Sequence, residues 1–536
     1  MNRISDLSQR KKIRDVENWM MRVIWIEGFF LALFPSIATF ALMVGVILWF
    51  LRLQVDKNFK LRSLPYDLPM ILFVIISAAS VFFSPVKSFD LTYNFLILAG
   101  TYILTYILIG QNIRTAEQIK FFVKAIGASA VFVVLCGYFQ YIFGVDIADM
   151  KWIDGEAFPE LRKRIFSTLE NPNVLAGYLD VMICIALGIL AKFGDKKQKI
   201  LLVVAIVLMA ACLAMTYSRG AFLTMAIVFV IYGVIQDWRI LILFTVLIAL
   251  LFYGDTTFST RIISIFTETL DSSEGLRIGI WVSTIPMIAD HPFIGVGWGA
   301  FKYIYPQYNY YLADTSITIY HAHNLYLNTA AEIGIIGALA YFWYFFGTMF
   351  MALNLSSNRR YTIITSTAEF ISIKIFEKLN SLIPTNAFLK WLDNLKENFK
   401  RRLRIFANKI LNKLGMGKSE DDTEKNAKTK DRRDPNLVHH DELKRSSRKK
   451  KSSDKDDDKF DIQKFAEIAN IPTAKEIAEL KNKNFVEGVQ FGIGLAFLSM
   501  AINGFADNLL FNIQSSMLMW QLGALAAACQ SLEIKA

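Results

Sequence analysis

The apolar residues of this chain are gathered into blocks about twenty residues long, and this pattern restricts the fold more than any other feature of the sequence. A helix of that length matches the thickness of the hydrocarbon core and satisfies its own backbone hydrogen bonds inside lipid. The composition agrees, because 54% of the residues are hydrophobic and only 20% are charged. The sequence therefore predicts an all-α, polytopic membrane protein.

Hydropathy along the chain predicts about 12 transmembrane helices. The last two are separated from the first ten by a long polar stretch. The predicted spans lie near residues 20–36, 37–53, 67–84, 91–110, 119–143, 173–193, 199–217, 220–236, 239–254, 331–353, 486–505 and 513–530.

The orientation of the spans is predicted from the lysines and arginines of the short loops, which collect on the cytoplasmic side of a membrane. Three basic clusters fall on one side if both termini are cytoplasmic. The larger segments at about 144–172 and 255–330 then face outward. The clusters are Arg52, Lys57, Lys60 and Arg62; Arg114 and Lys120; and Lys192, Lys196, Lys197 and Lys199.

Residues 354–485 form a polar insert between the membrane segments 1–353 and 486–536, and the insert carries most of the net charge of +11. The basic character is therefore local and does not indicate nucleic acid as a partner. Apolar residues recur at steps of three and four over about 386–414, which predicts an amphipathic basic helix on an anionic lipid surface. The stretch at about 418–459 is too polar to bury a core and is predicted to be disordered. A dispensable solvated loop is the alternative for the whole insert.

Arg219 stands in the outward turn between two predicted spans, in the sequence Thr216-Tyr217-Ser218-Arg219-Gly220. Ser218 is expected to cap the following helix, and a helix N-terminus beside a guanidinium can bind phosphate. The alternative is an arginine that reaches the lipid headgroups.

Two further arginines are predicted on the outward side. Arg277 begins an amphipathic outward segment, and Arg164 precedes Asn173 in the other outward loop. The positive charge of Arg164 runs against the usual inward bias of lysine and arginine, and Arg277 could place a second guanidinium in the same cavity as Arg219. Ordinary loop charge is the alternative.

His321 and His323 lie in the segment His321-Ala322-His323-Asn324, directly before the tenth span. Two histidines two residues apart could chelate a metal on an extended chain, but no third cysteine or histidine stands near them, so no metal site is predicted. A histidine beside a bound phosphate is suited to act as general base toward an acceptor hydroxyl. A histidine that only anchors the helix is the alternative.

Together these segments resemble the O-antigen ligase and polymerase superfamily. Asn324 follows His323, and nine residues separate Asn324 from the sequence Gly334-Ile335-Ile336-Gly337, a spacing similar to the ligase signature. The turn from Thr216 to Ala221 is similar to the Ser-Arg-Gly turn of the family. Three segments resemble the start of the family's large periplasmic loop: Arg277 to Trp281, His291-Pro292 and the run Gly295 to Gly299. Ala506-Asp507-Asn508, between the last two predicted spans, also fits the family pattern. The insert is not recognised as a family feature.

The resemblance implies a GT-C-like glycosyltransferase of the bacterial inner membrane. Such an enzyme moves a glycan from undecaprenyl pyrophosphate to a lipid A–core or other glycan acceptor on the periplasmic side, among membrane lipids. Arg219 and Arg277 would bind the donor pyrophosphate, and His323 would be catalytic. Ser218, Asn324, His321, Arg164 and Asn173 would support the site. No cofactor, metal or nucleotide-sugar site is expected, because the lipid-linked donor is already activated.

Three other functions remain open at this stage. A polymerase would extend the glycan on its own carrier, and a protein O-oligosaccharyltransferase would use a protein acceptor. The spacing between the histidine and the glycines favours the ligase. A polysaccharide transporter would also have many spans and outward arginines, but it would not need a histidine in the largest outward loop.

Overall fold

The computed structural model describes residues 2–56, 59–144, 164–192, 196–254, 259–260, 263, 272–309, 318–353 and 474–533. Most of these residues are helical and none of them forms a strand, which confirms the all-α prediction. The predicted insert helix at 386–414 and the charged stretch at 418–459 lie outside the described residues.

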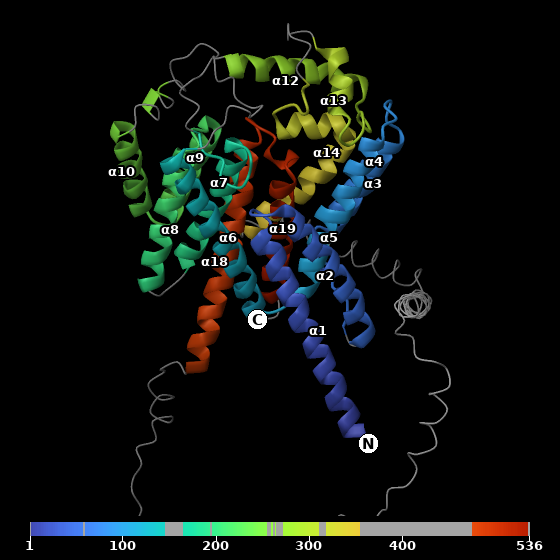
Figure 1. Cartoon of the computed structure of the whole chain (residues 1–536), viewed down its shortest axis with the longest axis vertical. Coiled ribbons are helices and arrows are strands. Elements are labelled where there is room, and N and C mark those ends of the chain that lie inside the picture. The colour runs from blue at the N-terminus through green and yellow to red at the C-terminus, as the bar shows by residue number, and fades with distance from the viewer. Residues whose placement is uncertain are drawn as a thin grey trace, which may run out of the picture. The chain divides into compact units, whose positions relative to one another are not determined.

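Helices occur at all twelve predicted spans (Figure 1). Along the first half of the chain these are α1 (Asn2–Phe30), α2 (Pro35–Val55), α3 (Asp67–Phe82), α4 (Phe89–Ile97), η1 (Leu98–Ile103), α5 (Leu104–Asn112), α6 (Ala116–Phe143), α7 (Pro172–Lys192), α8 (Lys196–Ala214), α9 (Arg219–Ile235) and α10 (Arg239–Gly254). The second half contributes α12 (Ser272–Asp290), α13 (Phe301–Ile304), η3 (Tyr305–Tyr308), α14 (Leu325–Ala352), α18 (Ala474–Asn503), η6 (Leu509–Phe511) and α19 (Ile513–Glu533).

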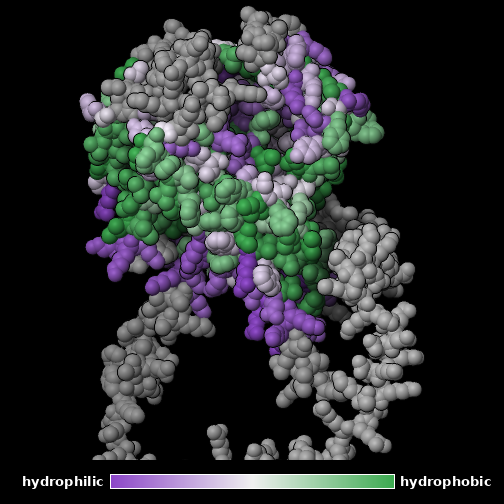
Figure 2. All heavy atoms as spheres, in the orientation of Figure 1, coloured by the Kyte–Doolittle hydropathy of each residue, from purple (hydrophilic) through white to green (hydrophobic). Residues whose placement is uncertain are grey.

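Within the described residues, seven helices are long and apolar enough to cross a membrane. One of them is the continuous helix Phe89–Asn112, which comprises α4, η1 and α5. The other six are α2, α6, α7, α8, α14 and the part of α18 from Glu479. The shorter helices α3, α9 and α10 are also apolar. Figure 2 shows apolar residues in a belt around the middle of the visible face, with polar residues gathered below it. The chain is therefore a multi-helix membrane protein, while the number of twelve crossings, the GT-C-like class and the orientation stay predictions.

The middle of the helical bundle is formed by α7, α14, α18 and α19, whose inward faces are almost completely buried. Trp520 of α19 shows how dense this region is. Its ring stacks on Tyr344 of α14 at 4.3 Å between centroids and lies 5.8 Å from Tyr106 of α5. Helix α3 packs against α14, and α12 packs against α14 near Ala331. This packing fixes the end of α14 at which the histidines lie.

Candidate active site

Helix α14 begins at Leu325, and the side chain of Asn324 determines that start. Its amide oxygen accepts hydrogen bonds from the backbone N–H groups of Tyr326 and Leu327, both at 3.0 Å, which are unsatisfied at any helix N-terminus. Its amide nitrogen donates to the carbonyl of Phe505 at 3.1 Å. Asn324 therefore holds the segment before α14 against the turn between α18 and η6, and it supports the site by position.

His323 takes a left-handed backbone conformation, with φ of 46°, directly before that cap. Its Nδ1 lies 3.1 Å from Oδ1 of Asp507, whose residue is only 8% exposed. A carboxylate can only accept a hydrogen bond, so Nδ1 of His323 must be the donor. The neutral ring then keeps an unprotonated Nε2, which is the form that a general base requires.

The other oxygen of Asp507 faces two nitrogen donors. Nδ2 of Asn173 donates to Oδ2 at 3.3 Å, and Nη2 of Arg277 lies 3.9 Å from it. Arg164 continues the network, because its guanidinium donates to Oδ1 of Asn173 at 2.8 Å and to the carbonyl of Thr216 at 2.7 Å. The network connects the histidine segment to the turn that contains Arg219.

These contacts decide the charge of Asp507. Burial raises the pKa of a carboxyl group, but here the hydrogen bond from His323 and the nearby positive charge of Arg277 hold the pKa well below its ordinary value. Asp507 is therefore an anion throughout the physiological pH range. A fixed anion at this position stabilises an imidazolium on His323.

His321 has a different role in the cluster. Its Nδ1 accepts a hydrogen bond from the backbone N–H of His323 at 3.1 Å, and the two rings lie 4.2 Å apart. Burial, followed by the nearby charges of His323 and Arg277, lowers the pKa of His321 to about 3. His321 therefore stays neutral and shapes the backbone that presents His323.

The nitrogen and oxygen atoms of His321, His323 and Asp507 lie within 4.8 Å of one another, so this triplet has the spacing of a possible metal site. The sequence analysis considered only cysteine and histidine as a third metal ligand and did not consider a carboxylate. In this structure Nδ1 of each ring has a hydrogen-bond partner, and the guanidinium of Arg277 adds positive charge beside Asp507.

Ser218 occupies the N-cap position of α9, as predicted, but its side chain makes no capping hydrogen bond. The prediction of a side-chain cap is therefore wrong. The hydroxyl of Thr216 closes this turn instead, because it donates to the carbonyl of Leu213 and accepts from the backbone N–H of Ser218. Arg219 begins α9 and is half-buried.

The start of α9 abuts the turn that carries Asp507. A Cβ atom added to Gly220 would lie 3.5 Å from Cβ of Ala506 and 3.6 Å from Oδ1 of Asn503. Arg219 is therefore adjacent in sequence to a residue that contacts this turn. No direct contact between Arg219 and Asp507 is observed in the described part of the chain.

A kink in α14 fixes a second wall of the site. Gly334 has φ of 71° and ψ of 174°, a conformation that is open essentially only to glycine. The broken helix leaves the carbonyls of Ala331 and Glu332 free to accept from the N–H groups of Val296 and Gly297, each at 2.9 Å. The glycine run at 295–299 is thus docked on the kink, so the two glycine runs of the sequence meet here.

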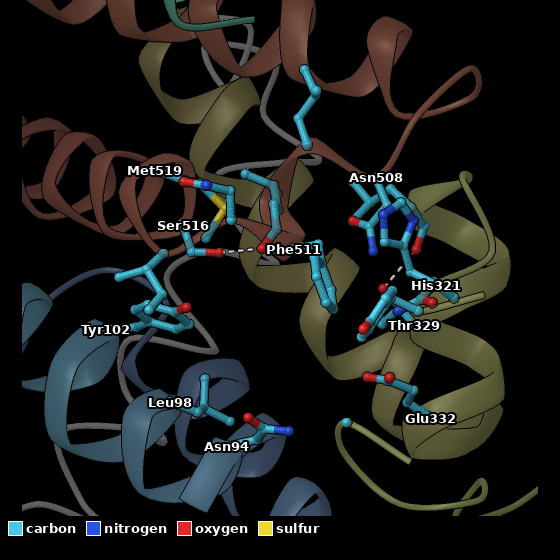
Figure 3. A pocket seen from close by; sticks show the side chains of 18 of the residues that line it. Asn94, Leu98, Tyr102, His321, Thr329, Glu332, Asn508, Phe511, Ser516 and Met519 are labelled. Atoms are coloured by element: carbon cyan, nitrogen blue, oxygen red, sulfur yellow. Dashed lines mark hydrogen bonds between the residues drawn. The ribbon is translucent and has the colours of Figure 1, made fainter. Parts of the chain in front are cut away.

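A cavity of about 780 Å³ opens beside His323, between α4 and η1 on one side and α14, η6 and α19 on the other (Figure 3). Its volume lies within the usual range of ligand sites. Its lining is rich in side-chain amides and aromatic rings, and includes Tyr93, Asn94, Asn171, Asn173, Trp298, Lys302, Tyr320, His321, His323, Asn328, Glu332, Asp507, Asn508 and Asn512.

The structure thus brings His321, His323, Asn173, Arg164 and Arg277 into one network of contacts with Asp507. That these residues form a common functional site stays a prediction. Of the eight predicted site residues, His321, His323 and Asn173 line the cavity, whereas Arg164, Arg219, Arg277, Ser218 and Asn324 do not. Asp507 was noticed in the sequence only as part of a matching tripeptide. Its role depends on contact with His323, from which it is 184 residues distant in the chain.

Fold and site together define a polytopic membrane protein with a histidine–aspartate pair beside a polar cavity and arginines next to it. Residues 204–342 match the model of the family described as O-antigen ligase, so this part of the chain is similar to that family. The matched region contains Arg219, Arg277, His323 and Gly334, whereas Asn173 and Asp507 lie outside it. A comparison with curated proteins found no match.

Proposed function

We propose that this protein is an O-antigen ligase-type glycosyltransferase. It moves a glycan from undecaprenyl pyrophosphate to a lipid A–core acceptor on the periplasmic side of the bacterial inner membrane. The family match supports the reaction class, and the outward position of the site follows from the predicted orientation of the spans.

The hydrogen bond from Nδ1 of His323 to Asp507 is the observation that carries the proposal. Nε2 of His323 accepts the proton of the acceptor hydroxyl while that oxygen bonds to C1 of the donor sugar. The bond between C1 and the pyrophosphate oxygen breaks, and its electron pair leaves with the pyrophosphate. Asp507 stabilises the imidazolium that forms.

The leaving pyrophosphate needs positive charge, and arginine supplies it in a planar, bidentate form. Arg277 lies beside Asp507, and Arg219 begins the helix that abuts the same turn. In this proposal both guanidinium groups bind the donor pyrophosphate, so the reaction does not depend on a metal ion. Arg164 and Asn173 hold Asp507 in place.

A polymerase and a protein O-oligosaccharyltransferase would use the same donor chemistry, and they differ only in the acceptor. The spacing between the histidine and the glycines in the sequence favours the ligase. A transporter needs no base at the cavity, so the pairing of His323 with Asp507 favours an enzyme over transport.

The test is reconstitution of the purified protein in liposomes that contain a defined undecaprenyl-pyrophosphate glycan and lipid A–core, with EDTA present. Mass analysis of the extracted lipids then identifies the product. Transfer of the glycan to core supports the ligase. A longer glycan on its carrier would indicate a polymerase, modification only of an added protein would indicate an oligosaccharyltransferase, and activity that requires a divalent cation would contradict the metal-independent mechanism.

A further inference from the structure

The part of the cavity formed by α4, α14 and the turn before α13 differs in charge from the neighbourhood of the arginines. No arginine is found among the described residues that line the cavity, and the amino group of Lys302 is already paired with Asp90 at 3.0 Å. Carboxyl groups also line it, including that of Glu332. This charge distribution does not suit a pyrophosphate, but it suits an uncharged molecule rich in hydroxyl groups.

Asn94 of α4 and Trp298 offer hydrogen-bonding groups on one side of this space. Both line the cavity, and no described residue forms a hydrogen bond with the side-chain amide of Asn94 or with the indole N–H of Trp298. Gly299 makes room for the amide, because a Cβ atom at Gly299 would lie 2.3 Å from Nδ2 of Asn94. The indole ring of Trp298 packs edge-on against Phe73 at 5.7 Å, which holds it in position.

Asn328 and Glu332 face the same space from α14. They are four residues apart and therefore lie on one face of the helix. Oδ1 of Asn328 accepts from the backbone N–H of Ala322 at 3.0 Å, whereas its Nδ2 has no acceptor among the described residues. The carboxyl group of Glu332 is fixed by the backbone N–H groups of Gly299 and Phe301. Figure 3 shows Glu332 and Asn94 on separate walls of the cavity.

We propose that Asn94, Trp298, Asn328 and Glu332 form a subsite that binds one uncharged sugar ring of the acceptor. Amide and carboxyl groups bind ring hydroxyls as donors and acceptors. An indole presents a broad apolar face together with one N–H donor, which matches the mixed apolar and polar surface of a sugar. This inference rests on the proposed glycosyltransferase function.

The acceptor, rather than the donor, fits this subsite for a geometric reason. His323 lines the cavity, whereas Arg277 contacts the opposite oxygen of Asp507 and does not line it. The acceptor hydroxyl must reach His323, and the pyrophosphate must reach the arginines. A sugar in the cavity therefore approaches the reacting carbon from the side away from the leaving group.

The test uses the variant Asn94→Ala in the full-length protein, with Thr92→Ala as a matched control. Thr92 lies on the same helix, is exposed and does not line the cavity. Loss of one hydrogen bond to the sugar should raise the KM for the acceptor about fivefold, with kcat and the KM for the donor unchanged. The control should behave as the wild type. Trp298→Phe, which keeps the ring packed on Phe73, should give a similar shift.

Binding is measured separately from transfer, so that failure of the subsite is distinguishable from failure of the proposed function. Saturation-transfer NMR of a dephosphorylated core oligosaccharide, freed of lipid A, should show binding to His323→Ala protein. The signal should be lost when Asn94→Ala is added. Three results would each overturn the subsite. The first is absence of oligosaccharide binding to His323→Ala protein, and the second is a raised KM for the donor in place of the acceptor. The third is unchanged kinetics and binding in both subsite variants. Absence of all transfer by wild-type protein would contradict the proposed function, and the binding measurement would still decide the subsite.

Discussion

Oδ1 of Asp507 lies 3.1 Å from Nδ1 of His323, although 184 residues separate them in the chain. The contact joins the start of α14 to the turn after α18. It determines which ring nitrogen of His323 carries the proton, and therefore which nitrogen can accept one.

The variant Asp507→Asn tests this relationship. An asparagine amide can donate to Nδ1, which would move the ring proton to Nε2 and remove the base. We expect kcat for glycan transfer to fall by about two to three orders of magnitude. The measurement is the initial rate in liposomes. The control is Asp237→Asn, whose side-chain oxygen accepts a hydrogen bond from the backbone N–H of Arg239 in an exposed turn. This variant should keep the wild-type rate. A wild-type rate for Asp507→Asn would show that the contact with Asp507 does not prepare His323 as the base.

Arg219→Lys should be nearly as damaging as removal of the charge, because an ammonium group cannot replace a planar guanidinium that binds two phosphate oxygens. We expect kcat/KM for the lipid-linked donor to fall roughly a hundredfold. Donor titration in the liposome assay measures this value. The control is Arg239→Lys at the start of α10. Equal activity of Arg219→Lys and wild type would mean that Arg219 serves only the lipid headgroups.

Gly334→Ala should destabilise the fold around the cavity. The residue has φ of 71°, and a Cβ atom there would lie 2.3 Å from the carbonyl oxygen of Phe293. Backbone strain alone costs about 1–3 kcal/mol, so the melting temperature in detergent should fall. Gly127→Ala provides the control, because Gly127 lies in α6 and a Cβ atom there meets nothing within 4 Å. Equal melting temperatures for both variants would disprove the requirement for glycine at the kink.

Acid should destabilise the protein through His321. Its pKa in the folded protein, about 3, lies below its ordinary value of 6.5, so the unfolded chain binds more protons and stability falls as the pH drops from 7 toward 3. The pKa of Asp507 is also lowered, but its contribution is lost only below the ordinary value of 3.8. Between pH 7 and 5, the melting temperature of wild-type protein should therefore fall more than that of His321→Asn.

His321→Asn keeps an oxygen that can accept the backbone N–H of His323, so the comparison isolates protonation of the ring. His291→Asn, outside the network, should lose as much stability on acidification as the wild type. Equal acid sensitivity of His321→Asn and wild type would refute a neutral His321. EDTA is present throughout, because His321 also belongs to the triplet with metal-ligand spacing.

The sequence predicted the helices well, because long apolar blocks give a strong signal and most of the packing in a membrane protein follows from them. The sequence singled out His323 and Arg277 as site residues; the structure places both in contact with Asp507, and their roles stay predictions. It misassigned the cap of α9, since the sequence does not tell whether Ser218 or Thr216 bonds the turn. Asp507 and the cavity could not be derived from local pattern, because they depend on how α14 and the end of α18 meet.

Single-turnover transfer by wild-type and His323→Ala proteins in the same liposomes, with EDTA present and protein levels matched, tests the central claim most directly. The account predicts that wild-type protein transfers the glycan and that His323→Ala, inserted and folded as judged by its melting temperature, transfers at least about a hundredfold more slowly. A wild-type rate for His323→Ala would contradict the assignment of His323 as the base and, with it, the proposed active site.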